Sequence, residues 1–382
     1  MSKSRFRRPC IAAPIVVGLA SVLLACSSQG TTPSTSASAD TESARNAAAA
    51  AAEKVSEYSS PDQAFPEVGG RFDPGEHSAV VISGGSSAPV VQENSEKTVE
   101  AFEQMGWRVT GPLDGQFNAA TVGGYIDRAV ADNADSITLT SVNVEDVGES
   151  AKRALQAGLT VACLMCAKND ELADLGVMYV TVDFEAQGEI LGWYLIDRSQ
   201  GAGTIVNVVD PGVAATVRRT QGVTATIAAN CPDCTVNDDL VLPSADVQKP
   251  GPPQWTAFLN STPEGSVTDV ASMADVVGVA LSKGLRDIGR TDIRMSGYDA
   301  DPEAIELIGQ ENSTYSGTVA LPYSWGSWAI ADLSARAVAG QDLWESDNLP
   351  MQLVTTENVE DFDDLTPTSS WQEEFKSKWT AS

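Results

Sequence analysis

The feature that most constrains the fold is a regular alternation of short apolar runs and amphipathic segments between residues 79 and 339. The short runs are rich in Val, Ile, Leu and Thr, and this composition is typical of buried strands. The predicted strands are Ala79–Ser83, Trp107–Gly111, Ser136–Thr140, Thr160–Leu164, Met178–Val182, Gly203–Val209, Val236–Leu242, Val267–Ala271, Ile293–Tyr298 and Thr318–Leu321. The predicted helices are Val91–Met105, Ala119–Asp132, Val144–Ala157, Glu185–Ser199, Ala214–Ala229, Met273–Arg286, Pro302–Gln310 and Trp328–Ala339. Near-continuous apolar strands that alternate with helices indicate α/β architecture, with parallel sheets covered on both faces.

The eight predicted helices make too many crossovers for one compact open sheet. The elements divide near Asp183 into two groups, each long enough to form its own core. We therefore predict two doubly wound lobes.

The N-terminus has the order of an export signal. Four basic residues precede an uncharged apolar stretch from Cys10 to Ala25, which is too short for the ~30 Å hydrocarbon core of a membrane. The stretch ends in Leu23-Leu24-Ala25-Cys26, which resembles the bacterial lipobox. We expect residues 1–25 to be a signal peptide and Cys26 to carry the lipid that anchors the protein at the extracytoplasmic face of the cell membrane. The alternative is an unmodified cysteine of the signal segment, as Cys10 is.

Residues 26–76 are predicted to be a tether. Ser, Thr, Ala and Gly dominate residues 27–45, a composition that buries little apolar surface. The alanine-rich run Ser43–Tyr58 has helical propensity, and the Pro- and Gly-rich stretch Ser59–Glu76 would break such a helix. We include both in the tether.

Charge and composition exclude several classes of function. The formal net charge of −28 and the lack of a basic patch argue against nucleic-acid binding. The only histidine, His77, precedes the strand-helix region, so neither a Ser-His-Asp triad nor a histidine-bearing zinc centre can form within it. Phosphate-binding glycine motifs are also lacking. We therefore expect neither catalytic activity nor a cofactor or metal site.

Several phrases along the chain occur in an order that is specific when taken together. They are Phe102–Trp107, Leu113–Gly115, Ile126–Ile137, Ala154–Val161, Asp183 with Gly188, Arg219–Val223, Ser296–Asp299 and Gly317–Pro322. In this order the chain resembles the type I periplasmic sugar-binding receptors, the ribose-binding class, from Ala79 to about Gly340.

The resemblance implies two lobes joined by three chain crossings, near Val182–Asp183, Ala320–Pro322 and Leu353–Thr355. Lobe 1 would comprise residues 77–182 and 322–353, and lobe 2 residues 183–321 and 354–382. It also implies that a small molecule, a sugar or sugar-like solute, binds between the lobes and closes the hinge. The partner would then be the permease of an ABC transporter, with the receptor acting as a monomer. A sensory receptor of the same fold, which presents its ligand to a membrane signalling partner, is the alternative.

Candidate ligand contacts in lobe 1 follow from the same resemblance. Ser86 and Ser87 lie in a small-residue loop after the first strand, where backbone amides could face the cleft; a plain turn is the alternative. Met165, followed by Cys166, stands where sugar-binding members carry an Asp-Arg pair, which weakens the assignment of a pentose or hexose. Asp183 marks the first crossing.

Candidate contacts in lobe 2 and at the hinge are charged or aromatic. Asp299 ends a strand where the family has a hydrogen-bonding aspartate, and we expect its carboxylate to face solvent in an open cleft; a helix cap or hinge contact is the alternative. Arg218 or Arg219 would offer directed donors, although adjacent helical residues cannot both face the cleft squarely. Tyr323 and Trp325 would stack at the rim, or else pack within the hinge.

Two Cys-x-x-Cys pairs, Cys163–Cys166 and Cys231–Cys234, are compatible with local disulfides in an oxidising compartment. Four such cysteines also fit a zinc site in a cytosolic protein, but the predicted lobes separate the two pairs. For Cys163 and Cys166, free thiols near the ligand remain the competing state.

Overall fold

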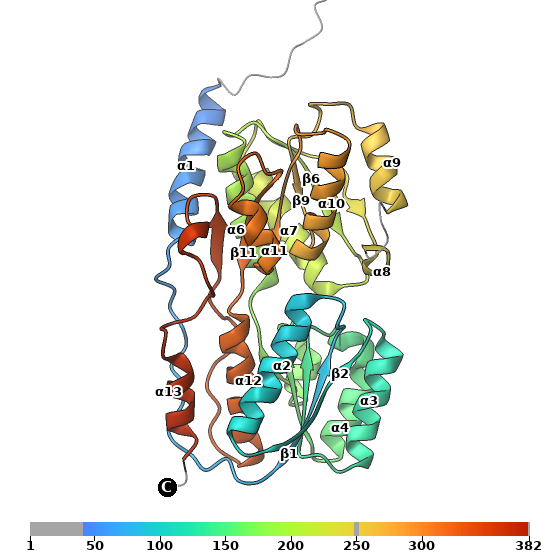
Figure 1. The fold of residues 1–382 in the computed structure, drawn as a ribbon, viewed down its shortest axis with the longest axis vertical. Coiled ribbons are helices and arrows are strands. Elements are labelled where there is room, and N and C mark those ends of the chain that lie inside the picture. The colour runs from blue at the N-terminus through green and yellow to red at the C-terminus, as the bar shows by residue number, and fades with distance from the viewer. Residues whose placement is uncertain (1–40, 248–251, 381–382) are drawn as a thin grey trace, which may run out of the picture. The chain divides into compact units, whose positions relative to one another are not determined.

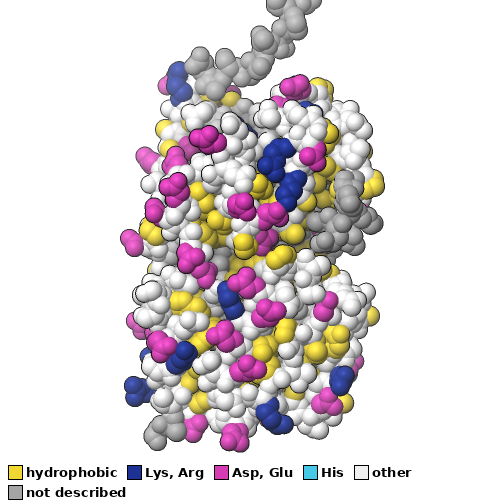
Figure 2. Space-filling view, viewed as in Figure 1, with side chains coloured by type: hydrophobic (Ala, Val, Ile, Leu, Met, Phe, Trp, Pro, Cys, Tyr) yellow, Lys and Arg dark blue, Asp and Glu magenta, His cyan; other side chains and the backbone are white. Residues whose placement is uncertain are grey.

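The computed structural model describes residues 41–247 and 252–380. The predicted signal peptide, Cys26 and the first part of the predicted tether lie outside these residues. Within them, no helix has the length and apolar character needed to cross a membrane. Acidic side chains are spread over the face in Figure 2 and outnumber basic ones there, as the net charge of the chain leads one to expect.

The first lobe contains a parallel sheet of five described strands in the order β2-β1-β3-β4-β5. The strands are β1 Ser78–Ser83, β2 Arg108–Asp114, β3 Ser136–Thr140, β4 Thr160–Leu164 and β5 Met178–Val180. Helices α2 (Pro89–Gln104) and α12 (Tyr323–Val338) cover one face, while α3 (Ala119–Ala131) and α4 (Gly148–Gln156) cover the other. Consecutive residues of β1 point alternately into the two cores, which is why its run is apolar throughout.

The second lobe contains a mixed sheet in the order β12-β11-β10-β9-β6-β7, with β8 paired to β6. Its strands are β6 Thr204–Val209, β7 Thr235–Val236, β8 Leu240–Val241, β9 Asp269–Ala271, β10 Arg294–Tyr298, β11 Tyr315–Ala320 and β12 Gln352–Thr355. Its helices α6 (Phe184–Arg198) and α7 (Ala214–Asn230) pack on one face, and α10 (Asp275–Asp287) and α11 (Pro302–Ile308) pack on the other. The shorter elements are η1 Val144–Val147, α5 Asp170–Asp174, α8 Ser244–Val247, α9 Pro253–Ser261, η2 Val359–Asp361 and α13 Trp371–Lys378.

The prediction of two α/β lobes built on parallel sheets is confirmed, since all strand pairs but one are parallel in the described residues (Figure 1). One detail differs, because the edge strand β12 pairs antiparallel to β11. The predicted strand Val236–Leu242 is instead two short strands that pair at different levels of β6.

Residues 42–58 do not belong to a tether, and that prediction is corrected. They form α1 (Glu42–Tyr58), whose buried face of Ala44, Ala47 and Ala51 packs against α6 of the second lobe (Figure 1). A Cβ at Gly201 would lie 2.2 Å from the carbonyl oxygen of Ala44, so only glycine permits this approach. Thr41 caps the helix and donates to Asp233 at 2.5 Å. The alanine side chains on this face of α1 let the backbone pack closely against the second lobe, so the contact does not require a stripe of large apolar side chains.

The segment after α1 also packs on the folded protein, but on the first lobe. Phe72 is buried in the core beside α12, and its amide donates to the carbonyl of Lys378 at 2.9 Å. The Arg336 guanidinium lies 4.3 Å from the Phe72 ring centroid and donates to the Gly70 carbonyl at 2.8 Å. Residues 59–72 therefore form a further crossing between the lobes, which we call the N-terminal strap.

The C-terminal residues require a second correction, because we expected residues 354–382 in lobe 2. Trp371 and Phe375 of α13 pack against α12 and belong to the first lobe's core. The chain therefore returns to the first lobe after β12 and η2. Together with the N-terminal strap, this return adds to the three predicted crossings.

Candidate binding cleft

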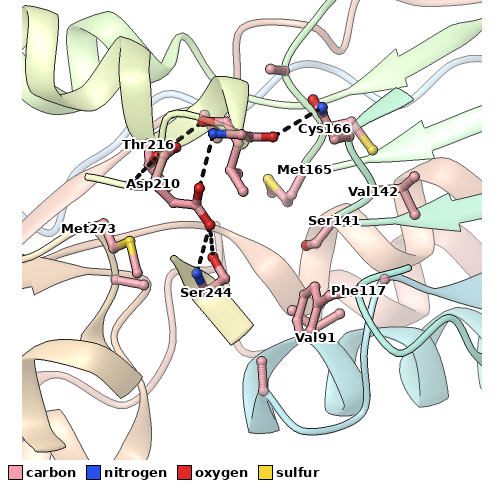
Figure 3. A pocket seen from close by; sticks show the side chains of 18 of the residues that line it. Val91, Phe117, Ser141, Val142, Met165, Cys166, Asp210, Thr216, Ser244 and Met273 are labelled. Atoms are coloured by element: carbon pink, nitrogen blue, oxygen red, sulfur yellow. Dashed lines mark hydrogen bonds between the residues drawn. The ribbon is translucent and has the colours of Figure 1, made fainter. Parts of the chain in front are cut away.

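A cavity of about 530 Å³ lies between the lobes at the carboxyl ends of their strands. Segments that follow β1, β3 and β4 line it from the first lobe, and segments that follow β6, β9 and β10 line it from the second. Its volume is within the usual range of small-molecule sites. Figure 3 shows Met165, Ser141 and Val142 facing it from one side, and Asp210, Ser244 and Met273 from the other.

A buried ion pair lies at the second-lobe wall. Arg219 Nη2 donates to Asp299 Oδ1 at 2.7 Å, Nε donates to Gln187 Oε1 at 2.7 Å, and Nη1 donates to the Met273 carbonyl at 2.8 Å. The guanidinium also lies 4.5 Å from the centroid of the Tyr298 ring. Asp299 is only 8% exposed, so its carboxylate does not face solvent in this structure, whereas we expected it to do so in an open cleft.

Tyr323 joins this pair from the hinge. Its hydroxyl donates to Asp299 Oδ1 at 3.1 Å. Burial, reinforced by the neighbouring Asp299 carboxylate, raises the pKa of Tyr323 well above its usual value, so the hydroxyl keeps its proton. Three of the predicted site residues therefore meet at one point of the wall.

Two further carboxyls, which the sequence reasoning missed, lie beside this group. Asp275 accepts from Tyr315 Oη at 2.5 Å, from Thr318 Oγ1 at 2.8 Å and from the Asp301 amide at 3.0 Å. Burial raises the pKa of Asp275 well above its usual value, and the carboxylates of Asp301 and Asp299 add to the effect. Asp275 follows the end of β9, and Asp301 follows the end of the neighbouring strand β10. This position after a strand is the sequence feature that could have identified them as residues of the site.

Asp301 has an unusual environment. The side chain lines the cavity and is 5% exposed, and its buried Oδ1 has no hydrogen-bond partner among the described residues. Burial, with a smaller contribution from the Asp299 charge, raises the pKa of Asp301 to about 7. The carboxyl therefore titrates near neutral pH.

Asp210, at the end of β6, was also missed. Its Oδ2 accepts from the amide and hydroxyl of Ser244, each at 2.7 Å, and its Oδ1 accepts from the Gly212 amide at 2.9 Å (Figure 3). These bonds fix the loop before α7. They leave the carboxylate occupied by partners within the protein.

On the first-lobe side, Met165 and Ser87 line the cavity and Ser86 does not. Met165 is 4% exposed, with φ at +50°. It sits inside the loop that the Cys163–Cys166 disulfide closes, and Thr181 Oγ1 donates to the Cys166 carbonyl at 2.8 Å. Ser86 donates its amide and hydroxyl to Asp114, at 3.0 and 2.7 Å, and so connects two loops.

The second disulfide, Cys231–Cys234, lies away from the cavity at the end of α7. Cys231 is buried in the core that α1 and α6 share, and Asp233 within the loop accepts from Thr41. The disulfide loop thus supports the docking of α1. No group of acidic, histidine or cysteine side chains in the described residues has the arrangement of a metal site.

Besides Ser86, three predicted contacts do not line the cavity. Asp183 caps α6, where its Oδ1 accepts from the amides of Glu185 and Ala186. Trp325 is 1% exposed and packs against Phe65, Trp344 and Phe375, because α12 begins at Tyr323 and turns this ring into the core.

Arg218 is the third of these predicted contacts outside the cavity. Its Nη2 donates to the Lys168 carbonyl across the lobes at 2.8 Å. Of the adjacent pair of arginines, only Arg219 lines the cavity.

Comparisons with known proteins agree with this geometry. The family model for the periplasmic binding protein domain matches residues 79–342. No curated protein shows significant similarity to the chain.

Solved structures with the same fold share little sequence with the chain. One is a sugar ABC transporter protein from Yersinia enterocolitica, with a TM-score of 0.68, 18% identity, and coverage of 80% of this chain and 96% of that chain. Another is a solute-binding protein from Agrobacterium vitis with bound allitol, with a TM-score of 0.67, 20% identity, and coverage of 75% and 97%. A third, from Burkholderia graminis in complex with D-arabinose, has a TM-score of 0.65, 18% identity, and coverage of 76% and 99%. These likenesses show the fold, and the matched domain shows that the chain belongs to the periplasmic binding protein family.

Proposed function

We propose that the protein captures a small organic solute, such as a sugar or a sugar-like molecule, between its lobes for import by an ABC transporter. The observation that carries this proposal is the 530 Å³ cavity that both lobes line at the carboxyl ends of their strands. A solute in this position contacts both lobes at once, so its binding favours the closed form. The solved relatives named for sugars and ABC transporters support the same role.

Within the cleft, we propose that Ser87, Met165, Arg219, Asp299 and Tyr323 form part of the binding surface. Arg219 and Tyr323 each hydrogen-bond to Asp299, so the three side chains act as a preorganised wall rather than as three separate ligand contacts. Arg218 instead links the two lobes through its hydrogen bond to the Lys168 carbonyl.

We further propose that the receptor is exported, is lipidated at Cys26 and acts as a monomer that hands its solute to a permease without chemical turnover. The basic and apolar N-terminal segment and the Leu23–Cys26 box support export and lipidation. Binding without turnover accords with membership of a binding-protein family.

The test is a thermal-shift screen of the purified protein against allitol, D-arabinose, D-allose, polyols, nucleosides and amino acids. A ligand at one hundred times its dissociation constant should stabilise the folded state by about 2.7 kcal/mol. Small-angle scattering on saturation should then show closure, and chromatography should recover the ligand unchanged. Stabilisation without closure, or conversion of the ligand, would contradict the proposal.

A further inference from the structure

Most polar side chains of the cleft already have partners within the protein. Arg219 uses three of its nitrogen atoms on Gln187, Met273 and Asp299. Asp210 is occupied by donors from Gly212 and Ser244. A ligand rich in hydroxyls would need a partner for each group that loses water, and these side chains would have to break existing bonds to supply them.

Much of the remaining lining is apolar and comes from both lobes. Val91, Val142 and Met165 contribute from the first lobe. Val213, Met273 and Val276 contribute from the second. Figure 3 shows Met165 and Met273 reaching toward the cavity from different lobes. Unbranched thioether side chains adapt their shape to an apolar partner, so this surface fits a carbon skeleton better than a ring of hydroxyls.

The charged side chains that line the cavity are mostly acidic. The described lining residues carry four carboxylates, on Asp146, Asp210, Asp299 and Asp301, against the single guanidinium of Arg219. Asp299 neutralises that guanidinium, which leaves Asp146, Asp210 and Asp301 as the remaining acidic side chains of the lining. The field inside the cavity therefore favours a cation and disfavours an anion.

Asp301 supplies the point of attachment. Asp301 is one of the residues that line the cavity, and its Oδ1 is buried without a hydrogen-bond partner in the described part of the chain. A buried carboxylate in this state is costly, and a charged donor that approaches it from the cavity would relieve the cost.

We infer that the solute is a compact hydrophobic amine, whose ammonium group binds the carboxylate of Asp301 and whose carbon skeleton lies against the valine and methionine surface. This inference names the solute class of the proposed receptor and rests on that function. The carboxylate of Asp301 would be the main determinant of specificity, because the other polar side chains of the wall form hydrogen bonds within the protein.

The test compares two rigid probes that share one skeleton, 1-aminoadamantane and 1-adamantanol, with allitol and D-arabinose as sugar probes. Isothermal titration is performed at pH 8 on the wild-type protein, on Asp301→Asn and on Asp342→Asn. Asp342 is exposed after α12, away from the cavity, so its variant makes the same change in net charge. We expect the amine to bind the wild type at least tenfold more tightly than the alcohol, Asp301→Asn to abolish that difference, and Asp342→Asn to retain it.

Equal affinity for the amine and the alcohol in the wild type would overturn the inference, and this comparison does not depend on any variant folding. Unchanged amine binding by Asp301→Asn would also overturn it. Binding of a sugar probe without the amine would refute the solute class while leaving the proposed function intact. Binding of none of the four probes would refute the solute class, and a further failure of the wider solute screen would count against the receptor function itself.

Discussion

Arg219 Nη2 lies 2.7 Å from Asp299 Oδ1, with 7% and 8% of the two side chains exposed. The contact joins α7 to the end of β10, and the other nitrogens of Arg219 extend it to α6 and to the segment after β9. The ion pair therefore ties four segments of the second lobe together at the wall of the cleft. A buried pair of this kind is expensive to break from one side only.

Asp299→Ala should lower the free energy of unfolding by about 3–5 kcal/mol, because it leaves the Arg219 guanidinium buried without its carboxylate. Urea unfolding followed by circular dichroism measures the change. The double variant Arg219→Met/Asp299→Ala should recover most of the loss, since it removes both charges. A loss under about 1 kcal/mol in the single variant would mean that the pair is not buried in solution.

Asp301→Asn should stabilise the protein increasingly as the pH rises from about 4 to 7. The folded pKa of Asp301, about 7, lies above its unfolded value near 4, so over this window the unfolded chain releases the proton while the folded protein still retains it, and the wild type loses stability. The full difference is on the order of 4 kcal/mol. The ionisable groups that act on it are Asp275 of α10, Asp299 after β10, Glu93 of α2, Glu303 of α11, Tyr315 of β11 and Tyr323 of α12.

The measurement for Asp301 is the midpoint of thermal unfolding of wild type and variant at a series of pH values. The two curves should lie close together at pH 4 and separate toward pH 7. Parallel curves across the whole range would show that Asp301 does not titrate in the folded state as described.

Gly201→Ala should release α1 from the second lobe. The new Cβ would meet the Ala44 carbonyl at 2.2 Å, in addition to the strain that alanine has at φ +73°. Gly289→Ala is the matched control, since Gly289 has φ +74° and no atom within 4 Å of its Cβ position. Hydrogen exchange over residues 42–58 should accelerate in Gly201→Ala only. Equal exchange in the two variants would show that backbone strain, and not the helix contact, controls the effect.

Cys26→Ser should abolish lipidation and release the protein from the membrane into the soluble fraction. The reason is that the thiol of Cys26 is the acceptor of the lipid in the proposed lipobox. Fractionation of cells that express each form, with mass spectrometry of the N-terminal peptide, measures the outcome. Cys10→Ser serves as the control and should stay membrane-bound. Retention of the Cys26→Ser protein at the membrane would contradict the anchor.

The lobes could be predicted from the sequence because their strands are buried on both faces. Runs such as residues 79–83 and 205–209 are apolar at every position or nearly so, and a parallel sheet covered on both faces requires strands of this kind. The docking of α1 was not predictable in the same way. Its contact face is made of Ala44, Ala47 and Ala51, which bury little area and pack only because Gly201 lets the backbones approach.

The site could be predicted only in part, because the chain reveals which residues end strands but not which of them pair with one another. Arg219, Asp299 and Tyr323 were predicted as ligand contacts, whereas in the structure Arg219 and Tyr323 both donate hydrogen bonds to Asp299. Asp301 was overlooked two residues after Asp299, since its burial depends on the packing of α10 and α11. Trp325 was placed at the rim because the expected start of its helix was five residues too late, which changed the face on which the ring lies.

Under the proposed lipidation of Cys26, the docking of α1 would also set how far the folded protein can lie from the membrane. With Cys26 lipidated and the helix cap at Thr41 held on the second lobe, 15 residues connect the lipid to the folded protein, and a chain of this length spans at most about 50 Å. A tether that ran to residue 76 would reach about 170 Å. With the proposed anchor, the shorter connection would hold the second lobe close to the membrane surface, and so would raise its effective concentration at a membrane-bound permease without any added affinity between the two proteins.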